Sequence, residues 1–245
     1  MSGCSSRTRT WKSLSRSWRA GGSVKSYATP SVSGSGPAIH LVARRILATT
    51  LARGSTAYFV ANSDLSTFLE DLALIRPTDL TVVPRVCEML FQSYQSRLDQ
   101  RATRAELRET DYAEVLAHFR DEVLGGRIVR ILCGSAALAP ELVAFHESCL
   151  EVPFHNGYGT TETGFLMLDH RVQRPPVVDY KLVDVPELGY FTTDSPHARG
   201  ELLVKNKLIT SENYQRTDLT AEVFDEEGFY RTGDIMAEIE PDNLV

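Results

Sequence analysis

The chain has 245 residues, of which 42% are hydrophobic and 24% charged, and it carries a formal net charge of −6. This composition is typical of a globular protein and excludes a chain that is disordered throughout. Arginines interrupt the most apolar early stretch, so no run approaches the roughly 20 apolar residues that cross a bilayer, and no membrane span is expected. The four cysteines show no CxxC pair or metal-ligand spacing, which favours a reducing, cytoplasmic setting.

Charge divides the chain at Asp64. Residues 1–63 contain nine Lys or Arg and no acidic residue, whereas the rest contains 17 basic and 32 acidic residues. We expect residues 1–37, which are rich in serine, to form a disordered or non-native basic leader, because so polar a segment cannot build a core. A targeting peptide and a basic arm for nucleic acid are the alternatives for this leader. The acidic body disfavours the second alternative, so no nucleic-acid partner is expected.

Residues 38–176 alternate between helical and strand patterns, which predicts an α/β layer with a mainly parallel sheet. Pro84 and Pro140 each suit the first turn of a helix, where the N–H that proline lacks has no partner. Strands are expected at 56–61, 80–83 and 128–133, with another beginning near Pro153. Helices are expected at 38–53, 64–76, 84–98, 112–124 and 140–150.

Residues 177–245 are rich in strand patterns separated by glycine and proline turns. Strands are expected at 178–183, 201–204 and 235–239. We therefore predict that this part of the chain forms a β-rich subregion packed on the α/β layer.

A segment rich in glycine and threonine follows the strand that begins near Pro153. It reads His155, Asn156, Gly157, Tyr158, Gly159, Thr160, Thr161, Glu162, Thr163, Gly164. Glycines let a backbone approach a ligand closely, and threonine hydroxyls can bond phosphate oxygens. Glu162 offers a hard oxygen to Mg²⁺, and Tyr158 can stack on a planar base. The segment is therefore a candidate ligand site.

This segment resembles the YGxTE motif of the adenylate-forming superfamily, which includes acyl-CoA ligases and the adenylation domains of carboxylic acid reductases. Residues 229–234 are similar to the family's YRTGD motif, and a GEL element begins at Gly200 between the two. The resemblance covers about residues 40–245. Residues 178–190 and 221–225 are most similar to actinobacterial carboxylic acid reductases and the fatty-acid ligases grouped with them.

The resemblance implies a partial adenylate-forming large domain, with a mainly parallel sheet flanked by helices and followed by a β-rich subregion. It also implies a ligase reaction in which ATP activates a carboxylic or fatty acid to an acyl-adenylate. The acyl group would then pass to a thiol, either of CoA or of a carrier protein's phosphopantetheine. ATP or AMP and Mg²⁺ are the implied ligands.

The resemblance assigns roles to single residues. Thr161 and Glu162 would form the catalytic corner at the α-phosphate, where Glu162 also holds the metal. Asp234 would accept hydrogen bonds from the ribose hydroxyls. His40 and Gly134 would border the acid substrate. The other nucleotide contacts would be Ser135, Ala136, His155, Asn156, Gly157, Tyr158, Gly159 and Thr160.

Two elements of the family pattern do not occur in these 245 residues. One is the triphosphate loop that ends in Pro-Lys-Gly. The other is the catalytic lysine of the small C-terminal domain, and we expect this chain to end before that domain. We therefore expect weak nucleotide binding and slow adenylation. The alternative is a catalytically inactive remnant that acts, if at all, as a binding or structural protein. A hydrolase is excluded because the sequence has no GxSxG or SxxK motif.

Overall fold

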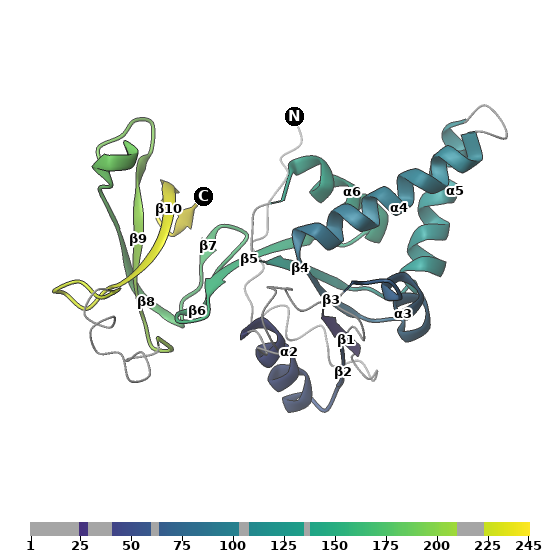
Figure 1. Cartoon of the computed structure of the whole chain (residues 1–245), viewed down its shortest axis with the longest axis horizontal. Helices are drawn as coiled ribbons and strands as arrows, with labels where there is room; N and C mark the ends of the chain where they lie inside the picture. Colours follow the sequence, from purple (N-terminus) through teal and green to yellow (C-terminus); the bar gives the residue numbers. More distant parts are fainter. Residues whose placement is uncertain (1–24, 29–40, 60–63, 103–107, 135–137, 210–222) are drawn as a thin grey trace, which may run out of the picture.

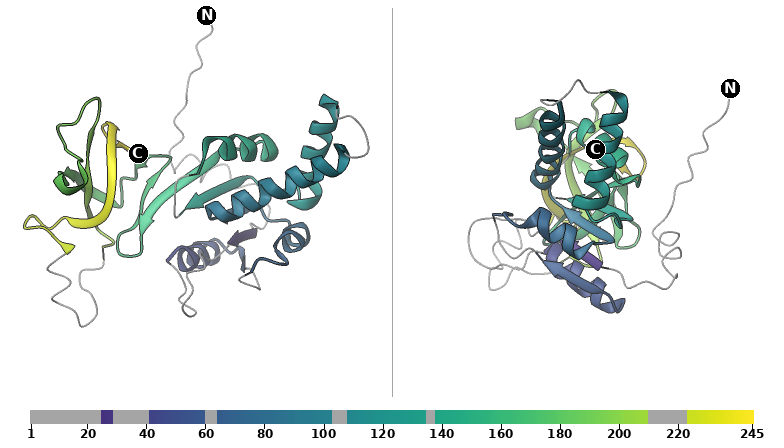
Figure 2. Two further views of the ribbon diagram at one scale, coloured as in Figure 1. Left: turned by 45° about the horizontal axis from the view of Figure 1, so that its top comes forward. Right: turned by 90° about the vertical axis from the view of Figure 1, so that its right-hand side faces the viewer.

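The computed structural model describes residues 25–28, 41–59, 64–102, 108–134, 138–209 and 223–245. Their strands form one 11-stranded sheet that runs through the whole molecule (Figure 1). The α-helices gather around one end of this sheet, and antiparallel strands form the other end (Figures 1 and 2). Among the described helices, none is long and apolar enough to cross a membrane.

The bounds of the elements follow from the backbone. The helices are α2 (Leu41–Ala52), α3 (Phe68–Ile75), α4 (Pro84–Ala102), α5 (Glu109–His118), the π-helix η1 (Phe119–Val123), α6 (Pro140–Leu150) and the 3₁₀-helix η2 (Pro186–Leu188). The strands are β1 (Lys25–Ala28), β2 (Thr56–Phe59), β3 (Asp79–Val82), β4 (Arg130–Gly134), β5 (Phe154–Thr160), β6 (Gly164–Leu168), β7 (Arg171–Val172), β8 (Val177–Val183), β9 (Ala198–Asn206), β10 (Tyr230–Glu240) and β11 (Asn243–Leu244). Their order in the sheet is β2-β1-β3-β4-β5-β6-β7-β11-β10-β9-β8.

The first half of the sheet is parallel, as predicted. Strands β1 to β5 pair in parallel with one another, and helices α4 and α6 begin at the two prolines that the sequence singled out. All four residues of β3 are buried, which is expected of a parallel strand in the interior of the sheet. The larger hydrophobic core lies in this half. Its largest fully buried side chains are Phe68, Leu72, Leu80, Leu90, Phe119, Leu124 and Ile131.

Strand β1 lies inside the segment for which we expected a leader. It pairs in parallel with β2 on one side and with residues 79–81 of β3 on the other. Residues 25–28 of the segment for which we expected a disordered or non-native leader therefore form a strand of the sheet, and the rest of 1–37 lies outside the described residues. The polar sequence of β1, KSYA, did not indicate a strand, because both strands with which it pairs come from later parts of the chain.

Strand β5 includes most of the glycine-rich segment. We expected a strand beginning near Pro153 with this segment after it, but residues 154–160 form a strand that pairs in parallel with β4 and antiparallel with β6. A Cβ on Gly157 would lie 2.7 Å from the Phe165 ring, and one on Gly159 would collide with the carbonyl group of Gly164. The glycines thus permit close approach between β5 and β6 rather than forming a loop.

The second half of the sheet is antiparallel. Strands β8, β9 and β10 pair with β9 in the centre, and β10 also pairs with β11. A smaller hydrophobic core lies on these strands together with β6. Its buried members are Leu166, Met167, Val177, Leu202, Val204 and Leu244. The change from parallel to antiparallel pairing occurs at β5, because β5 pairs antiparallel with β6. Strand β6 also contributes to the smaller core, and both strands precede the predicted boundary at residue 177.

The larger core contains a buried imidazole. His146 on α6 is 1% exposed, and its ring stacks on Phe154 with centroids 5.5 Å apart. Its Nε2 lies 3.2 Å from the Cys87 carbonyl oxygen, which can only accept a hydrogen bond, so Nε2 carries the proton. The other nitrogen, Nδ1, has no hydrogen-bond partner in the described structure. Burial lowers the pKa of His146 to about 4, and the bond to Cys87 opposes this shift in part.

We expect acid to destabilise the protein through His146. Because the unfolded chain binds a proton near pH 6.5 and the folded chain only near pH 4, the free energy of unfolding falls as pH decreases between these values. The expected loss attributable to this group is on the order of 1 to 3 kcal/mol. Urea unfolding at pH 7 and pH 4.5 measures it, and His146→Leu should show a smaller loss than the wild type. The exposed His118 provides the control, His118→Leu. An equal loss in His146→Leu and the wild type would contradict the assignment.

Candidate functional site

The two predicted motifs meet at Tyr158 and Asp234. The Tyr158 hydroxyl on β5 donates a hydrogen bond to Asp234 Oδ2 on β10 over 2.5 Å, between residues 76 positions apart. Three strands separate β5 from β10 in the order of the sheet, so the sheet curves to bring them together. Burial raises the pKa of Tyr158, and the adjacent Asp234 carboxylate raises it further. The phenol therefore stays protonated and acts as the donor, while Asp234 itself is exposed.

The backbone around Asp234 is fixed by a neighbouring strand. Gly233 has a φ of +75°, a left-handed conformation that glycine adopts without strain. Its N–H donates to Glu201 Oε1 over 3.3 Å, and the Asp234 N–H donates to Thr232 Oγ1 over 3.2 Å. The Thr232 hydroxyl in turn donates to the Leu202 carbonyl over 2.8 Å. The GEL element thus supports the YRTGD segment, a role for Glu201 and Leu202 that the sequence analysis did not identify.

A threonine turn connects β5 to β6. The Thr160 N–H donates to Thr163 Oγ1 over 3.3 Å, and the Thr163 N–H donates to Thr160 Oγ1 over 3.1 Å. Thr163 is 0% exposed, and its carbonyl accepts a bond from Asn206 Nδ2 over 2.7 Å. The Thr160 hydroxyl, which we predicted to contact nucleotide, is therefore engaged in the turn. Sequence analysis gave Thr163 no role because its partners are set by the folded turn.

The same turn presents the two predicted catalytic residues. Thr161 is exposed and Glu162 is half-buried at its tip. Within the described residues, Glu162 makes no hydrogen bond or ion pair, so its carboxylate oxygens are available to a ligand. Burial raises the pKa of Tyr230, and the charge of Glu162 adds to this effect. Glu162 therefore lies near Tyr230, at the start of β10.

His155 and Asn156 are tied to a residue that we did not predict. Asp169 Oδ2 lies 2.8 Å from His155 Nδ1, and Asp169 Oδ1 accepts the Asn156 N–H over 2.8 Å. The Asp169 N–H donates back to the Asn156 carbonyl over 2.7 Å. The only signal for Asp169 in the sequence is that of a turn residue, since its contacts depend on the hairpin formed by β5 and β6.

Gly134 ends β4, and Gly157 within β5 is its partner in the register of these parallel strands. A Cβ on Gly134 would meet only the Gly157 carbonyl oxygen, at 3.6 Å, whereas the space beside Gly157 is filled by the Phe165 ring. Among the described residues, the end of β4 at Gly134 is therefore the less crowded of the two positions. Three other predicted site residues, His40, Ser135 and Ala136, lie outside the described residues.

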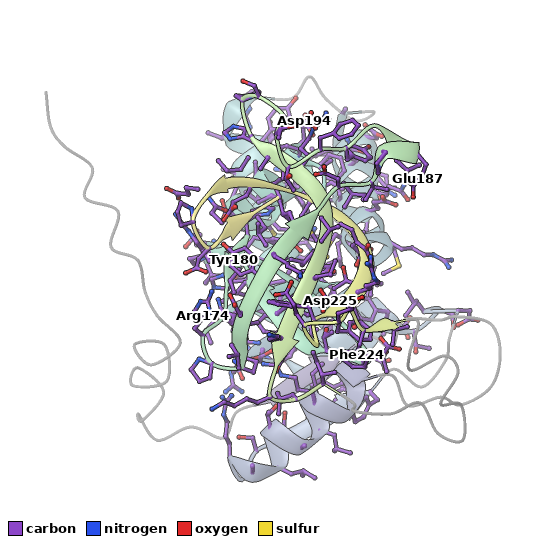
Figure 3. All side chains as sticks on the ribbon, turned by 90° about the vertical axis from the view of Figure 1, so that its left-hand side faces the viewer. Arg174, Tyr180, Glu187, Asp194, Phe224 and Asp225 are labelled. Carbon is purple, nitrogen blue, oxygen red and sulfur yellow. The ribbon has the colours of Figure 1, made fainter. Side chains whose placement is uncertain are left out.

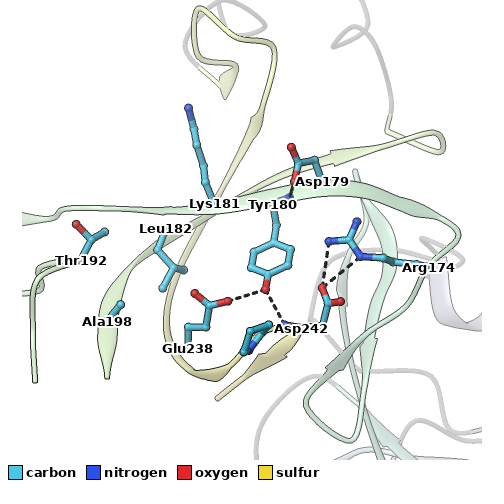
Figure 4. A pocket seen from close by; sticks show the side chains of 10 residues that line it. Arg174, Asp179, Tyr180, Lys181, Leu182, Thr192, Ala198, Glu238 and Asp242 are labelled. Carbon is cyan, nitrogen blue, oxygen red and sulfur yellow. Dashed lines mark hydrogen bonds and ion pairs between the residues drawn. The ribbon is translucent and has the colours of Figure 1, made fainter. Parts of the chain in front are cut away.

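A concavity of the described structure lies elsewhere, on the β-rich half. It measures about 540 Å³ and is lined in part by Arg174, Tyr180 and Glu238 (Figure 4). The Tyr180 hydroxyl donates to Glu238 over 2.7 Å and accepts the Asp242 N–H over 2.8 Å, while Arg174 pairs with Asp242 over 3.0 Å. Figure 3 shows Arg174 and Tyr180 together at this end of the sheet. These groups are already paired with one another. The predicted site therefore remains the better candidate for ligand binding.

Comparison with known proteins connects these features to one family. The profile of the family described as "AMP-binding enzyme" matches residues 8–214. Carboxylic acid reductases of Mycobacterium marinum and Mycobacterium tuberculosis are 53% and 54% identical to the chain over 209 and 210 residues, which is 85% of the chain in each case. The chain spans 18% of the length of these two curated relatives.

Solved structures show the same relationship. The A domain of the carboxylic acid reductase from Segniliparus rugosus, determined in complex with AMP and a co-purified carboxylic acid, is 47% identical, with a TM-score of 0.81 over 89% of this chain and 34% of that one. A malonyl-CoA ligase complex, 20% identical with a TM-score of 0.61, shares the fold. These matches confirm the predicted fold class, a partial adenylate-forming domain. The chain therefore belongs to the AMP-binding enzyme family.

Proposed function

We propose that this chain forms the nucleotide-binding part of an adenylation domain that activates a carboxylic acid with ATP. In that reaction a carboxylate oxygen attacks the α-phosphorus of ATP, so that an acyl-adenylate forms and pyrophosphate leaves. The observation that carries the proposal is the hydrogen bond between Tyr158 and Asp234, which joins the YGTTE and YRTGD segments into one site. The similarity to carboxylic acid reductases supports the choice of acid activation.

Each part of the site has a role in this proposal. The exposed Asp234 carboxylate accepts hydrogen bonds from the ribose hydroxyls. The Tyr158 ring and the end of β4 at Gly134 receive the adenine, because a planar base stacks on an aromatic ring and can lie closely against a residue without a side chain. Thr161 and Glu162 lie at the α-phosphate.

Magnesium fits this site only together with the nucleotide. Among the described residues, no group of three or more His, Cys, Asp or Glu side chains is arranged to hold a metal ion. Mg²⁺ is often held by one or two carboxylates and by phosphate oxygens, so Glu162, which has no other partner among the described residues, suits this type of site. When bound, the ion neutralises negative charge on the phosphates.

The substrates and setting of the reaction belong to the same proposal. The acid is a carboxylic or fatty acid, and the acyl acceptor is the thiol of CoA or of a carrier protein's phosphopantetheine. Similarity to a peroxisomal long-chain acyl-CoA synthetase of Arabidopsis thaliana, 30% identical over 226 residues, supports an acyl substrate. We propose a cytoplasmic setting, which fits the free and buried thiols of Cys87, Cys133 and Cys149.

As a polypeptide of these 245 residues, the protein should bind nucleotide better than it turns it over. The sequence lacks a Pro-Lys-Gly loop to hold the triphosphate. Loss of one preorganised donor costs about 3 to 4 kcal/mol of transition-state stabilisation in enzymes, so we propose that adenylation by this polypeptide is slowed by several orders of magnitude.

Nucleotide should stabilise the protein through Asp234. A ligand that binds only the folded state raises the free energy of unfolding, by about 2.7 kcal/mol at a hundredfold excess over its Kd. Thermal unfolding with and without AMP measures this effect, and Asp234→Ala should abolish it. Asp179→Ala, which removes another exposed carboxylate from the β-rich half, is the matched control and should keep the shift. No shift in the wild type, with a cooperative transition intact, would overturn the proposal in favour of a remnant without a nucleotide site.

Glu162 should couple Mg²⁺ to ATP rather than to AMP. We expect Glu162→Gln to remove most of the gain in ATP affinity that Mg²⁺ provides, because the neutral amide is a weaker ligand for a hard cation. Titration calorimetry of ATP with Mg²⁺ and with EDTA measures the gain, and AMP binding without metal serves as the reference. The exposed Glu187 offers the control variant Glu187→Gln. An unchanged Mg²⁺ effect in Glu162→Gln would contradict the assigned role.

A further inference from the structure

The carboxylate of Asp234 is already oriented before a ligand arrives. One of its oxygens, Oδ2, accepts the Tyr158 hydroxyl over 2.5 Å, and its backbone N–H is bound to Thr232 Oγ1. A carboxylate offers about four lone-pair directions. The phenol uses one of them, so enough remain for two vicinal hydroxyls. Because the Asp234 side chain is exposed, those remaining directions are accessible to a ligand.

The position of the Tyr158 hydroxyl is set by the core. Its residue lies in β5, opposite Met167 of β6, and packs against the smaller core. Asp234 lies where the register between β9 and β10 shifts, and a register shift between β5 and β6 follows Tyr158 directly. The contact therefore ties a side chain on an irregular part of β10 to a side chain that is held by packing against the smaller core. A donor held in this way reduces the number of orientations open to the carboxylate.

A second hydrogen-bonded pair of a tyrosine and a carboxylate in the chain can be compared with Tyr158 and Asp234. The Tyr180 hydroxyl donates to Glu238, also on β10, and simultaneously accepts the Asp242 N–H. Glu238 is half-buried, so this second pair is part of the packing of the β-rich half. Asp234 differs because its side chain is exposed while it accepts the Tyr158 hydroxyl.

We propose that the Tyr158 hydroxyl positions Asp234 for recognition of a vicinal diol, the 2′- and 3′-hydroxyls of the nucleotide's ribose. The proposal rests on the proposed function, in which Asp234 binds ribose. Stacking on adenine needs only an aromatic ring, which phenylalanine would also supply. The hydroxyl therefore acts through Asp234 and determines discrimination between a ribonucleotide and a nucleotide without the diol.

The test compares AMP with 2′,3′-dideoxy-AMP on the same proteins. Titration calorimetry gives the Kd of each ligand for the wild type, Tyr158→Phe and Tyr180→Phe. We expect Tyr158→Phe to weaken AMP binding about tenfold, the effect of losing one hydrogen bond that orients a charged group. Binding of dideoxy-AMP should not change, because that ligand cannot use the carboxylate. Tyr180→Phe loses the comparable hydroxyl remote from the site and should bind both ligands as the wild type does.

Three outcomes would overturn the inference. Equal weakening of both ligands by Tyr158→Phe would show that the hydroxyl supports the fold or the stacking surface. Tighter binding of AMP by Tyr158→Phe would show that the phenol competes with ribose for the carboxylate. No change for either ligand would show that Asp234 needs no such support. Failure of the wild type to bind AMP would instead overturn the proposed function, and this inference with it.

Discussion

The structure depends on the two different edges of β5. On one edge this strand continues the parallel sheet through β4, and on the other it begins the antiparallel sheet through β6. The edge toward β6 needs glycine, because side chains at 157 and 159 would meet the Phe165 ring and the backbone of Gly164. The larger core lies on the parallel side and the smaller core on the antiparallel side. A single strand therefore joins two halves that each have a hydrophobic core.

The candidate site combines residues of the joining strand β5 with residues of the antiparallel half. Tyr158 and Glu162 come from β5 and the turn that follows it, whereas Asp234 comes from β10 and depends on β9 for support through Glu201. Neither half contains the complete set of contacts. Changes that alter the curvature of the sheet between β5 and β10 would therefore affect the site even without touching a residue in it.

Much of this arrangement could be predicted from the sequence, and the remainder has a common physical cause. Helix starts at Pro84 and Pro140 were predictable because proline has a local reason to occupy the first turn. The motif residues were predictable because their chemical types and order are distinctive. Strand β1 and the contacts of Asp169 were not, since they depend on partners that only the folded sheet brings close. The full length of β5 was not predictable either, because the close packing against β6 that its glycines permit is visible only in the folded sheet.

The sheet ends at β8, and this position makes its outer edge a potential template for a strand of another molecule. Arg174, already paired with Asp242, also donates from Nη1 to the Val178 carbonyl over 2.6 Å, so one backbone acceptor of β8 is occupied. Lys181 adds a charge in the middle of the strand, held by Asp225 over 2.6 Å. Charged side chains placed in this way on an edge strand disfavour the edge-to-edge association that leads to aggregation.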